Sequence, residues 1–148
     1  MKLVSTKDPI LFKELQDVDI KNPQIDLKQT KEDMVELMVS KRGLGLSASQ
    51  VGIDYKVFVI GEDKENTMMF VNPKVLSVSE ETELDFEGCL SYPDVFLKMH
   101  RPISVEASWY DEDGNPQTGN FEGYTARCFL HEFDHLYGVV FSQKVSRL

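Results

Sequence analysis

The feature that most constrains the fold is an apolar pattern near the end of the 148-residue chain that also carries charged side chains. Between Tyr124 and Leu136, apolar residues recur at intervals of three and four, which predicts a helix with a buried face. Gly138 supplies a stop signal. Burying an ionisable group without a partner costs free energy, so the His, Glu and Asp side chains inside this pattern require a partner.

These polar residues form the segment HEFDH, residues 131–135. Histidines four positions apart lie on one side of a helix and one turn apart, so His131 and His135 can reach one metal ion. Glu132 lies where it can reach a water molecule at that ion, but it is poorly directed as a ligand. Two ligands and a general base are the physical basis of the H-E-x-x-H motif. The alternative is a solvated helix face that carries these residues by chance.

A catalytic metal needs a third protein ligand as well as an open position. Cys128 is nearest, but it lies a helix rise of roughly 10.5 Å from His135, too far for one ion to bridge. We therefore interpret Cys128 as a small apolar residue beneath the site. Cys89 is the stronger candidate, because Gly88 permits unusual backbone angles there and Pro93 is expected to end the strand. A buried structural cysteine is the alternative.

A third segment, GLGLSASQ at residues 43–50, combines small residues with one amide side chain. It lacks the lysine of a phosphate-binding P-loop. Small residues allow a peptide backbone to approach closely, and Gln50 is able to donate a hydrogen bond to a reacting oxygen. An ordinary solvated glutamine is the alternative.

The remaining patterns predict an α+β fold. Residues 27–42 have helical spacing, with Thr30 and Asp33 as a candidate capping box at a later start. Strands are expected at residues 56–60, 68–71 (closed by Asn72-Pro73), 75–78, 82–86 as a hairpin partner of 75–78, 103–110 and 117–122. We expect antiparallel β-sheets around a central helix that carries the HExxH motif, with an N-terminal helix, in a single domain over residues 1–148.

The composition of the chain limits the classes of partner that it is expected to bind. The chain has 16 basic and 25 acidic side chains, a net charge of −9 that disfavours nucleic acid. No apolar run approaches the ~20 residues of a membrane span, so no membrane partner is expected. The N-terminus has the character of neither a secretory signal nor a transit peptide. A cytoplasmic monomer is the default expectation.

The segments GLGLSASQ, EGCLS and HEFDH together resemble the peptide deformylase signature, which reads G-x-G-x-A-A-x-Q, E-G-C-x-S and H-E-x-D-H. The second and third match fully, and the first departs at Ser47, where the family usually has Ala. Bacterial members typically continue into an extra C-terminal helix, sometimes used for ribosome docking. This chain resembles shorter virus-encoded members, so we do not expect ribosome docking by that route.

The resemblance implies hydrolysis of the N-terminal formyl group of formyl-methionine in nascent polypeptides, with release of formate. It implies one divalent ion, Fe²⁺ first and Ni²⁺, Co²⁺ or Zn²⁺ as alternatives, bound by Cys89, His131 and His135 with water in the fourth position. Glu132 would take a proton from that water and deliver it to the leaving amine.

The resemblance also assigns the substrate contacts. Gln50 and the backbone N–H of Leu90 would donate to the oxyanion. The substrate would run beside Leu44 and Gly45 as an added strand. The residues expected to line the methionine pocket are Leu44, Tyr124, Cys128 and His131.

Outside these contacts, Glu87 and Arg101 are expected to pair and brace the Cys89 loop, and Asp134 to anchor the helix. Two other functions are compatible with the motifs. One is a different HExxH zinc peptidase, which would take its third ligand downstream, although residues 136–148 contain no His, Asp or Glu. The other is a non-catalytic metal-binding domain, or a redox module that uses Cys89 and Cys128.

Overall fold

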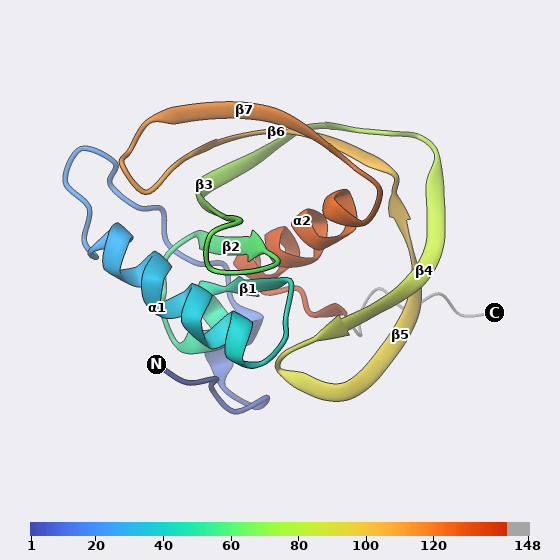
Figure 1. Cartoon of the computed structure of the whole chain (residues 1–148), viewed down its shortest axis with the longest axis horizontal. Helices are drawn as coiled ribbons and strands as arrows, with labels where there is room; N and C mark the ends of the chain where they lie inside the picture. Colours follow the sequence, from blue (N-terminus) through green and yellow to red (C-terminus); the bar gives the residue numbers. More distant parts are fainter. Residues whose placement is uncertain (142–148) are drawn as a thin grey trace.

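In the computed structural model, which describes residues 1–141, antiparallel strands surround one helix, as expected for the α+β class (Figure 1). The elements are η1 (Pro9–Phe12), α1 (Leu27–Ser40), β1 (Gly45–Ser47), η2 (Ala48–Val51), β2 (Val57–Gly61), β3 (Thr67–Val78), β4 (Thr82–Cys89), β5 (Tyr92–Pro102), β6 (Ser104–Tyr110), β7 (Pro116–Glu122) and α2 (Gly123–Leu136). The expected absence of a further C-terminal helix concerns residues 142–148, which lie outside the described part.

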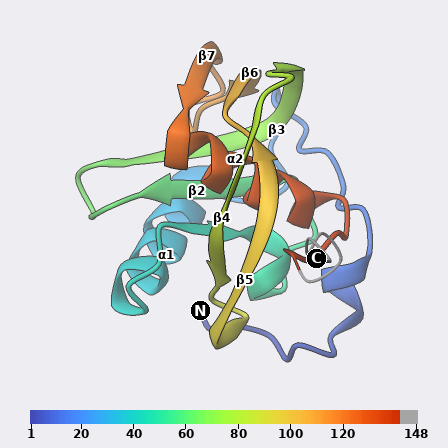
Figure 2. The ribbon, with the colours of Figure 1, turned by 90° about the vertical axis from the view of Figure 1, so that its right-hand side faces the viewer.

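The strands form two sheets. The larger has the order β1-β2-β3-β6-β7, so β1 is one of its edge strands. The smaller is the β4–β5 ribbon, which crosses in front of α2 in Figure 2. A two-residue turn, Leu90 and Ser91, joins its strands and places Cys89 opposite Tyr92. The second motif, EGCLS, therefore lies at the tip of this ribbon.

Helix α2 lies between the two sheets and contacts β1, β2, β5, β6 and β7. Its apolar face is centred on Phe129, which is fully buried. The Phe129 ring packs against those of Phe58 and Phe70, with centroids 5.1 and 5.2 Å away, and stacks on Phe121 at 5.4 Å. Because the aromatic contacts fix one face of α2, its opposite face presents His131, Asp134 and His135 to the β4–β5 ribbon. Within residues 1–141, no helix is long and apolar enough to cross a membrane.

Helix α1 begins earlier than the candidate capping box predicts. A carboxylate oxygen of Asp26 accepts a hydrogen bond from the Gln29 N–H at 3.0 Å and caps the helix at Leu27. Thr30 is buried and its N–H donates to the Asp26 carbonyl, so it belongs to the first turn. The capping-box interpretation of Thr30 and Asp33 is therefore wrong.

Three predictions about the strands are also wrong. The runs at 68–71 and 75–78 belong to one strand, β3, because Asn72 (φ 49°) and Pro73 lie at a register shift that the strand accommodates as an irregularity. The Asn72 side chain holds this irregularity by bonding the backbone of Val18. Residues 82–86 pair with β5 instead of with 75–78, and Pro93 lies at the start of a strand instead of ending one.

We expect Phe129→Ala to lower the free energy of unfolding by about 3–5 kcal/mol, because the truncation leaves a cavity among four other aromatic rings. Urea denaturation measures the change. Phe12→Ala is the matched control: that side chain is 49% exposed, and we expect a loss below about 1 kcal/mol. Equal losses in the two variants would contradict the central packing role of α2.

Candidate metal and active site

Three metal-ligating side chains converge between β4 and α2. Cys89 ends β4, and His131 and His135 lie one turn apart on α2; their candidate ligand atoms are all within 4.8 Å of one another. All three residues are buried, and the Cys89 Sγ lies 3.5 Å from the His135 Nε2. Cys128 is not a member of this group, although both cysteines are free thiols.

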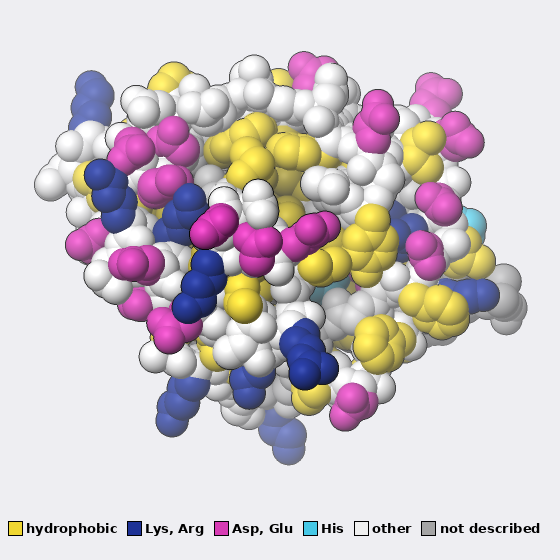
Figure 3. Space-filling model, viewed as in Figure 1, with side chains coloured by type: hydrophobic (Ala, Val, Ile, Leu, Met, Phe, Trp, Pro, Cys, Tyr) yellow, Lys and Arg dark blue, Asp and Glu magenta, His cyan; other side chains and the backbone are white. Residues whose placement is uncertain are grey.

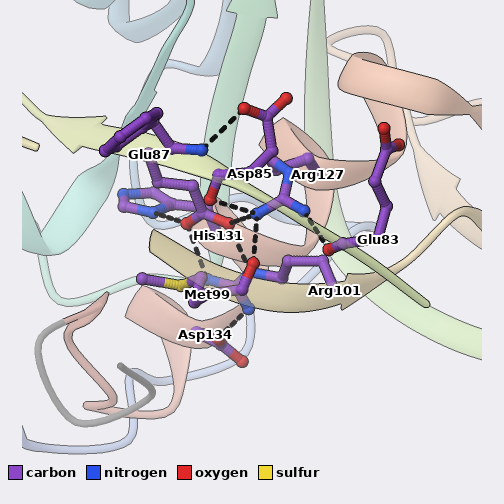
Figure 4. Close-up of polar contacts among 9 residues, drawn as sticks. Glu83, Asp85, Glu87, Met99, Arg101, Arg127, His131 and Asp134 are labelled. Atoms are coloured by element: carbon purple, nitrogen blue, oxygen red, sulfur yellow. Dashed lines mark hydrogen bonds and ion pairs between the residues drawn. The ribbon is translucent and has the colours of Figure 1, made fainter. Parts of the chain in front are cut away.

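Glu87 orients the first histidine. Its carboxylate accepts hydrogen bonds from Arg101 Nε at 2.7 Å, Arg101 Nη2 at 3.0 Å and Arg127 Nη1 at 2.9 Å (Figure 4). Burial alone would raise the pKa of Glu87, but hydrogen bonds from His131 and Arg101 and the Arg101 charge outweigh it and lower the pKa to about 2. The ionised carboxylate therefore accepts from the His131 Nδ1–H, 3.0 Å away, which leaves the His131 Nε2 lone pair for a cation.

The same network joins α2 to the β4–β5 ribbon. Arg101 Nη1 also donates to Asp134 at 2.6 Å, so the expected Glu87–Arg101 pair exists and Asp134 anchors the helix through it. Arg127 donates to the backbone carbonyls of Glu83 at 2.6 Å and Met99 at 3.1 Å. Sequence reasoning gave Arg127 no role. The available signal was a cation inside a buried apolar pattern, four positions before His131.

Glu132 is buried, and its Oε1 has no hydrogen-bond partner within residues 1–141. Burial, opposed in part by the His131 charge, raises the pKa of Glu132 to about 7, which suits a group that exchanges protons near neutral pH. A Cβ at Gly45 would lie 2.6 Å from the Glu132 Oε2. Glycine at position 45 therefore makes room for this carboxylate.

The Gln50 side chain is held at both ends. Its Oε1 accepts from the Ser47 N–H at 3.0 Å, and its Nε2 donates to the Ser91 Oγ at 3.0 Å and the Cys89 Sγ at 3.4 Å. The amide N–H₂ group is thus fixed beside the sulfur. Ser91, the last residue of EGCLS, was given no role from sequence, yet it orients this amide.

Ser47, where the family usually has Ala, is accommodated without loss of the loop. It is fully buried, and its Oγ lies 3.1 Å from the Oγ of Ser49, so the two hydroxyls form a hydrogen bond. The hydroxyl that Ser47 adds relative to the family pattern is therefore hydrogen-bonded to the Ser49 hydroxyl inside the protein.

A pocket of about 500 Å³ opens beside these groups. Its lining includes the residues expected at the substrate, namely Leu44, Gly45, Gln50, Cys89, Leu90, Tyr124, Cys128, His131 and Glu132. The space-filling view shows a hollow near the centre of one face with a histidine at its floor (Figure 3). Burial, followed by the Glu132 charge, raises the pKa of Cys128 to about 12, so its neutral thiol is an apolar part of the wall.

The donor set fits a divalent cation of borderline softness: one sulfur and two imidazoles. Burial lowers the pKa of His135 well below its usual value, which keeps that ring neutral, as a ligand must be. Burial would also lower the pKa of His131, but the Glu132 charge and hydrogen bonds to Cys89 and Glu87 outweigh it and raise the pKa to about 10. The negative groups around His131 thus stabilise a positive charge here, which the Nε2 proton carries in the metal-free site and which a bound cation would supply in its place.

The sequence and the fold both match known proteins. A sequence model described as polypeptide deformylase matches residues 1–148. The peptide deformylase of Zymomonas mobilis is 41% identical over 131 residues, covering 83% of this chain and 74% of the relative. That of Finegoldia magna is 40% identical over 142 residues, covering 95% and 86%.

Two solved structures have the same fold. The crystal structure of peptide deformylase from Thermotoga maritima has a TM-score of 0.91 at 36% identity, covering 99% of this chain and 97% of that one. The structure of a probable peptide deformylase from Synechococcus phage S-SSM7 has a TM-score of 0.86 at 34% identity, covering 97% and 99%. With the family match extending over residues 1–148, the chain belongs to the polypeptide deformylase family.

Proposed function

We propose that this chain is a metal-dependent peptide deformylase that removes the formyl group from N-terminal formyl-methionine of nascent polypeptides and releases formate. The observation that carries the proposal is the convergence of Cys89, His131 and His135, with the Glu132 carboxylate beside them in a substrate-sized pocket. Its setting would be the cytoplasm, where nascent chains emerge, and its working state a monomer.

Cys89, His131 and His135 would hold one divalent ion. Fe²⁺ is the first expectation, and Ni²⁺, Co²⁺ and Zn²⁺ also suit a thiolate with two imidazoles. When bound, such an ion supplies Lewis acidity, which lowers the pKa of a water molecule and polarises a carbonyl oxygen. The Glu87–His131 hydrogen bond would keep the imidazole in the tautomer that this binding needs.

Glu132 would act first as the general base and then as the general acid. Its carboxylate takes a proton from the water that attacks the formyl carbon, and it passes the proton to the amine nitrogen as the C–N bond breaks. The products are formate and a peptide with a free amino group. Gln50 Nε2 and the backbone N–H of Leu90 would donate to the formyl oxygen as its charge grows; loss of one such donor costs about 2.7–4 kcal/mol elsewhere.

The peptide would bind along the free edge of β1. That strand pairs with β2 on one side only, and Leu44 and Gly45 line the pocket on the other. Tyr124 and Cys128 would contact the methionine side chain. The competing zinc-peptidase interpretation needs a third ligand downstream of His135, whereas Cys89 lies beside the two histidines and would supply that ligand here.

The direct test is formate release from formyl-Met-Ala-Ser by protein loaded anaerobically with Fe²⁺ or Ni²⁺. We expect catalytic turnover with the formyl peptide and none with acetyl-Met-Ala-Ser, whose larger acyl group is the control. A fully loaded protein that releases no formate would overturn the proposed function.

The role of Glu132 predicts that Glu132→Gln binds the metal at wild-type stoichiometry but lowers kcat by about 10²–10⁴-fold, because the amide cannot accept the proton. Metal analysis and formate assays on one preparation measure both. Glu36→Gln, which changes an exposed acid in α1, should retain activity. Near-normal turnover by Glu132→Gln would remove Glu132 from the mechanism.

The contact between Gly45 and Glu132 predicts that Gly45→Ala lowers kcat by about 10²-fold, because the new methyl group displaces the carboxylate. Metal content should be unchanged. In a Glu132→Gln background, the same substitution should cost much less, since the two changes act through one group. Additive losses would show that position 45 acts on the substrate instead.

The Arg127 hydrogen bonds predict that Arg127→Met weakens metal binding by about 10–100-fold, because Glu87 loses a partner and no longer holds His131 rigidly. Chelator competition with Co²⁺ measures the affinity, and Lys21→Met controls for the lost charge. Arg127→Lys, which keeps the cation, provides a folded variant should the first be unstable. Wild-type affinity in both would contradict the role of Arg127.

A further inference from the structure

The mouth of the pocket carries charges that the proposed chemistry does not use. Two segments form the rim: residues 41–44, between α1 and β1, and residues 93–96, at the start of β5. The first contributes Lys41 and Arg42, and the second contributes Asp94. Gln50, Cys89 and Glu132 are buried at the inner end. A peptide with its N-terminus at the inner end must leave past this rim.

Among the exposed charged residues of the pocket lining, basic residues outnumber acidic ones, although the net charge of the chain is −9. Lys41, Arg42 and Asp94 are exposed, whereas two other charged lining residues, Glu87 and Arg127, are buried and paired with each other at 2.9 Å. Neither Lys41 nor Arg42 has an ion-pair partner within residues 1–141. The exposed part of the pocket lining thus carries two cations and one anion, and neither cation is paired within residues 1–141.

The backbone conformation of Arg42 at the end of α1 is also unusual. It has φ 58°, in the left-handed region, at the end of α1, where glycine is the favoured residue. The Arg42 N–H donates to the Val39 carbonyl at 3.0 Å, and the Gly43 N–H donates to the Met38 carbonyl at 2.9 Å, which closes the helix. A cation suits the negative end of a helix dipole, but Lys41 already provides one there. The end of the helix therefore does not require an arginine side chain at position 42, because glycine would make the same backbone hydrogen bonds.

The position of this turn is fixed relative to the active site. A Cβ at Gly43 would lie 2.6 Å from a side-chain carbon of Leu90, so the turn packs directly on the tip of the β4–β5 ribbon. Antiparallel strands pair residue by residue. With formyl-methionine beside Gly45, the third and fourth residues of an extended peptide would lie near Gly43 and Arg42, next to Lys41.

We propose that Lys41 and Arg42 make the enzyme prefer peptides with an acidic side chain at the third or fourth residue. This inference rests on the proposed function and names the substrate class of the same site. The charge lies far from the reacting bond, so it would stabilise bound substrate and transition state alike, and the preference would appear in KM more than in kcat.

The test compares formyl-Met-Ala-Xaa-Ser and formyl-Met-Ala-Ser-Xaa peptides with Xaa as Glu, Gln or Lys. At low salt, we expect one of the two series to show a charge preference. In that series, kcat/KM for the Glu peptide should exceed kcat/KM for the Lys peptide by about 3–10-fold, a range typical of one or two exposed ion pairs. In 1 M NaCl, where the screening length is about 3 Å, the ratio should approach one.

Three variants assign the effect. Arg42→Gly removes the charge and relieves the backbone, so the preference should shrink while the unfolding temperature stays equal or rises. Arg42→Glu should favour the Lys peptide. Lys21→Gln, which alters an exposed lysine outside the pocket lining, should keep the wild-type ratio.

The outcomes separate the two proposals. Equal kcat/KM for all peptides, or an unchanged preference in Arg42→Gly and Arg42→Glu, would overturn the charge preference and leave the proposed function intact. Failure to release formate from every peptide would overturn the proposed function itself.

Discussion

The site depends on one buried carboxylate, Glu87. It lies between the guanidinium groups of Arg101 and Arg127 and accepts the Nδ1–H of His131. Taking charges out of water is costly, and only good geometry with several hydrogen bonds repays that cost. Removing any partner would leave an uncompensated charge, so the network admits one arrangement. That arrangement fixes the imidazole, the ribbon and the helix relative to one another.

The two faces of α2 have different roles in forming this site. One face packs Phe129 among other aromatic rings and sets the height and rotation of the helix. The opposite face carries His131 and His135 toward Cys89, and Glu132 lies at the side of the helix against Gly45. An error of one residue in the aromatic packing would rotate the histidines by about 100°, away from the sulfur. Core packing and chemistry are therefore specified by the same fourteen-residue element.

Much of this organisation could be predicted from sequence because the signals are local. The four-residue spacing of the histidines in an apolar helical pattern can be recognised without knowledge of the fold. The three- and four-residue spacing of apolar residues likewise predicts both helices. The sequence alone pointed to Cys89 over Cys128, since helix rise separates Cys128 from His135. The structure agrees in bringing Cys89 to the two histidines.

The features that were missed depend on contacts distant in sequence. Strand β5 is mostly exposed and starts beside a proline, so its pairing with β4 has no local signature. The irregularity at Asn72 is held by Val18, 54 positions away. Arg127 contacts Glu87 only because the β4–β5 ribbon crosses the helix. Position 45 requires glycine because the Glu132 carboxylate lies against it, and not because of the local backbone conformation.

The central claim is that one sulfur and two imidazoles bind a single divalent ion. X-ray absorption at the metal edge, on protein loaded anaerobically with one equivalent of Ni²⁺ or Co²⁺, reads this coordination directly. One sulfur and two imidazole nitrogens should appear in the first shell, and Cys89→Ser should remove the sulfur while Cys128→Ser leaves it in place. A first shell without sulfur, or one whose sulfur survives in Cys89→Ser, would contradict the claim.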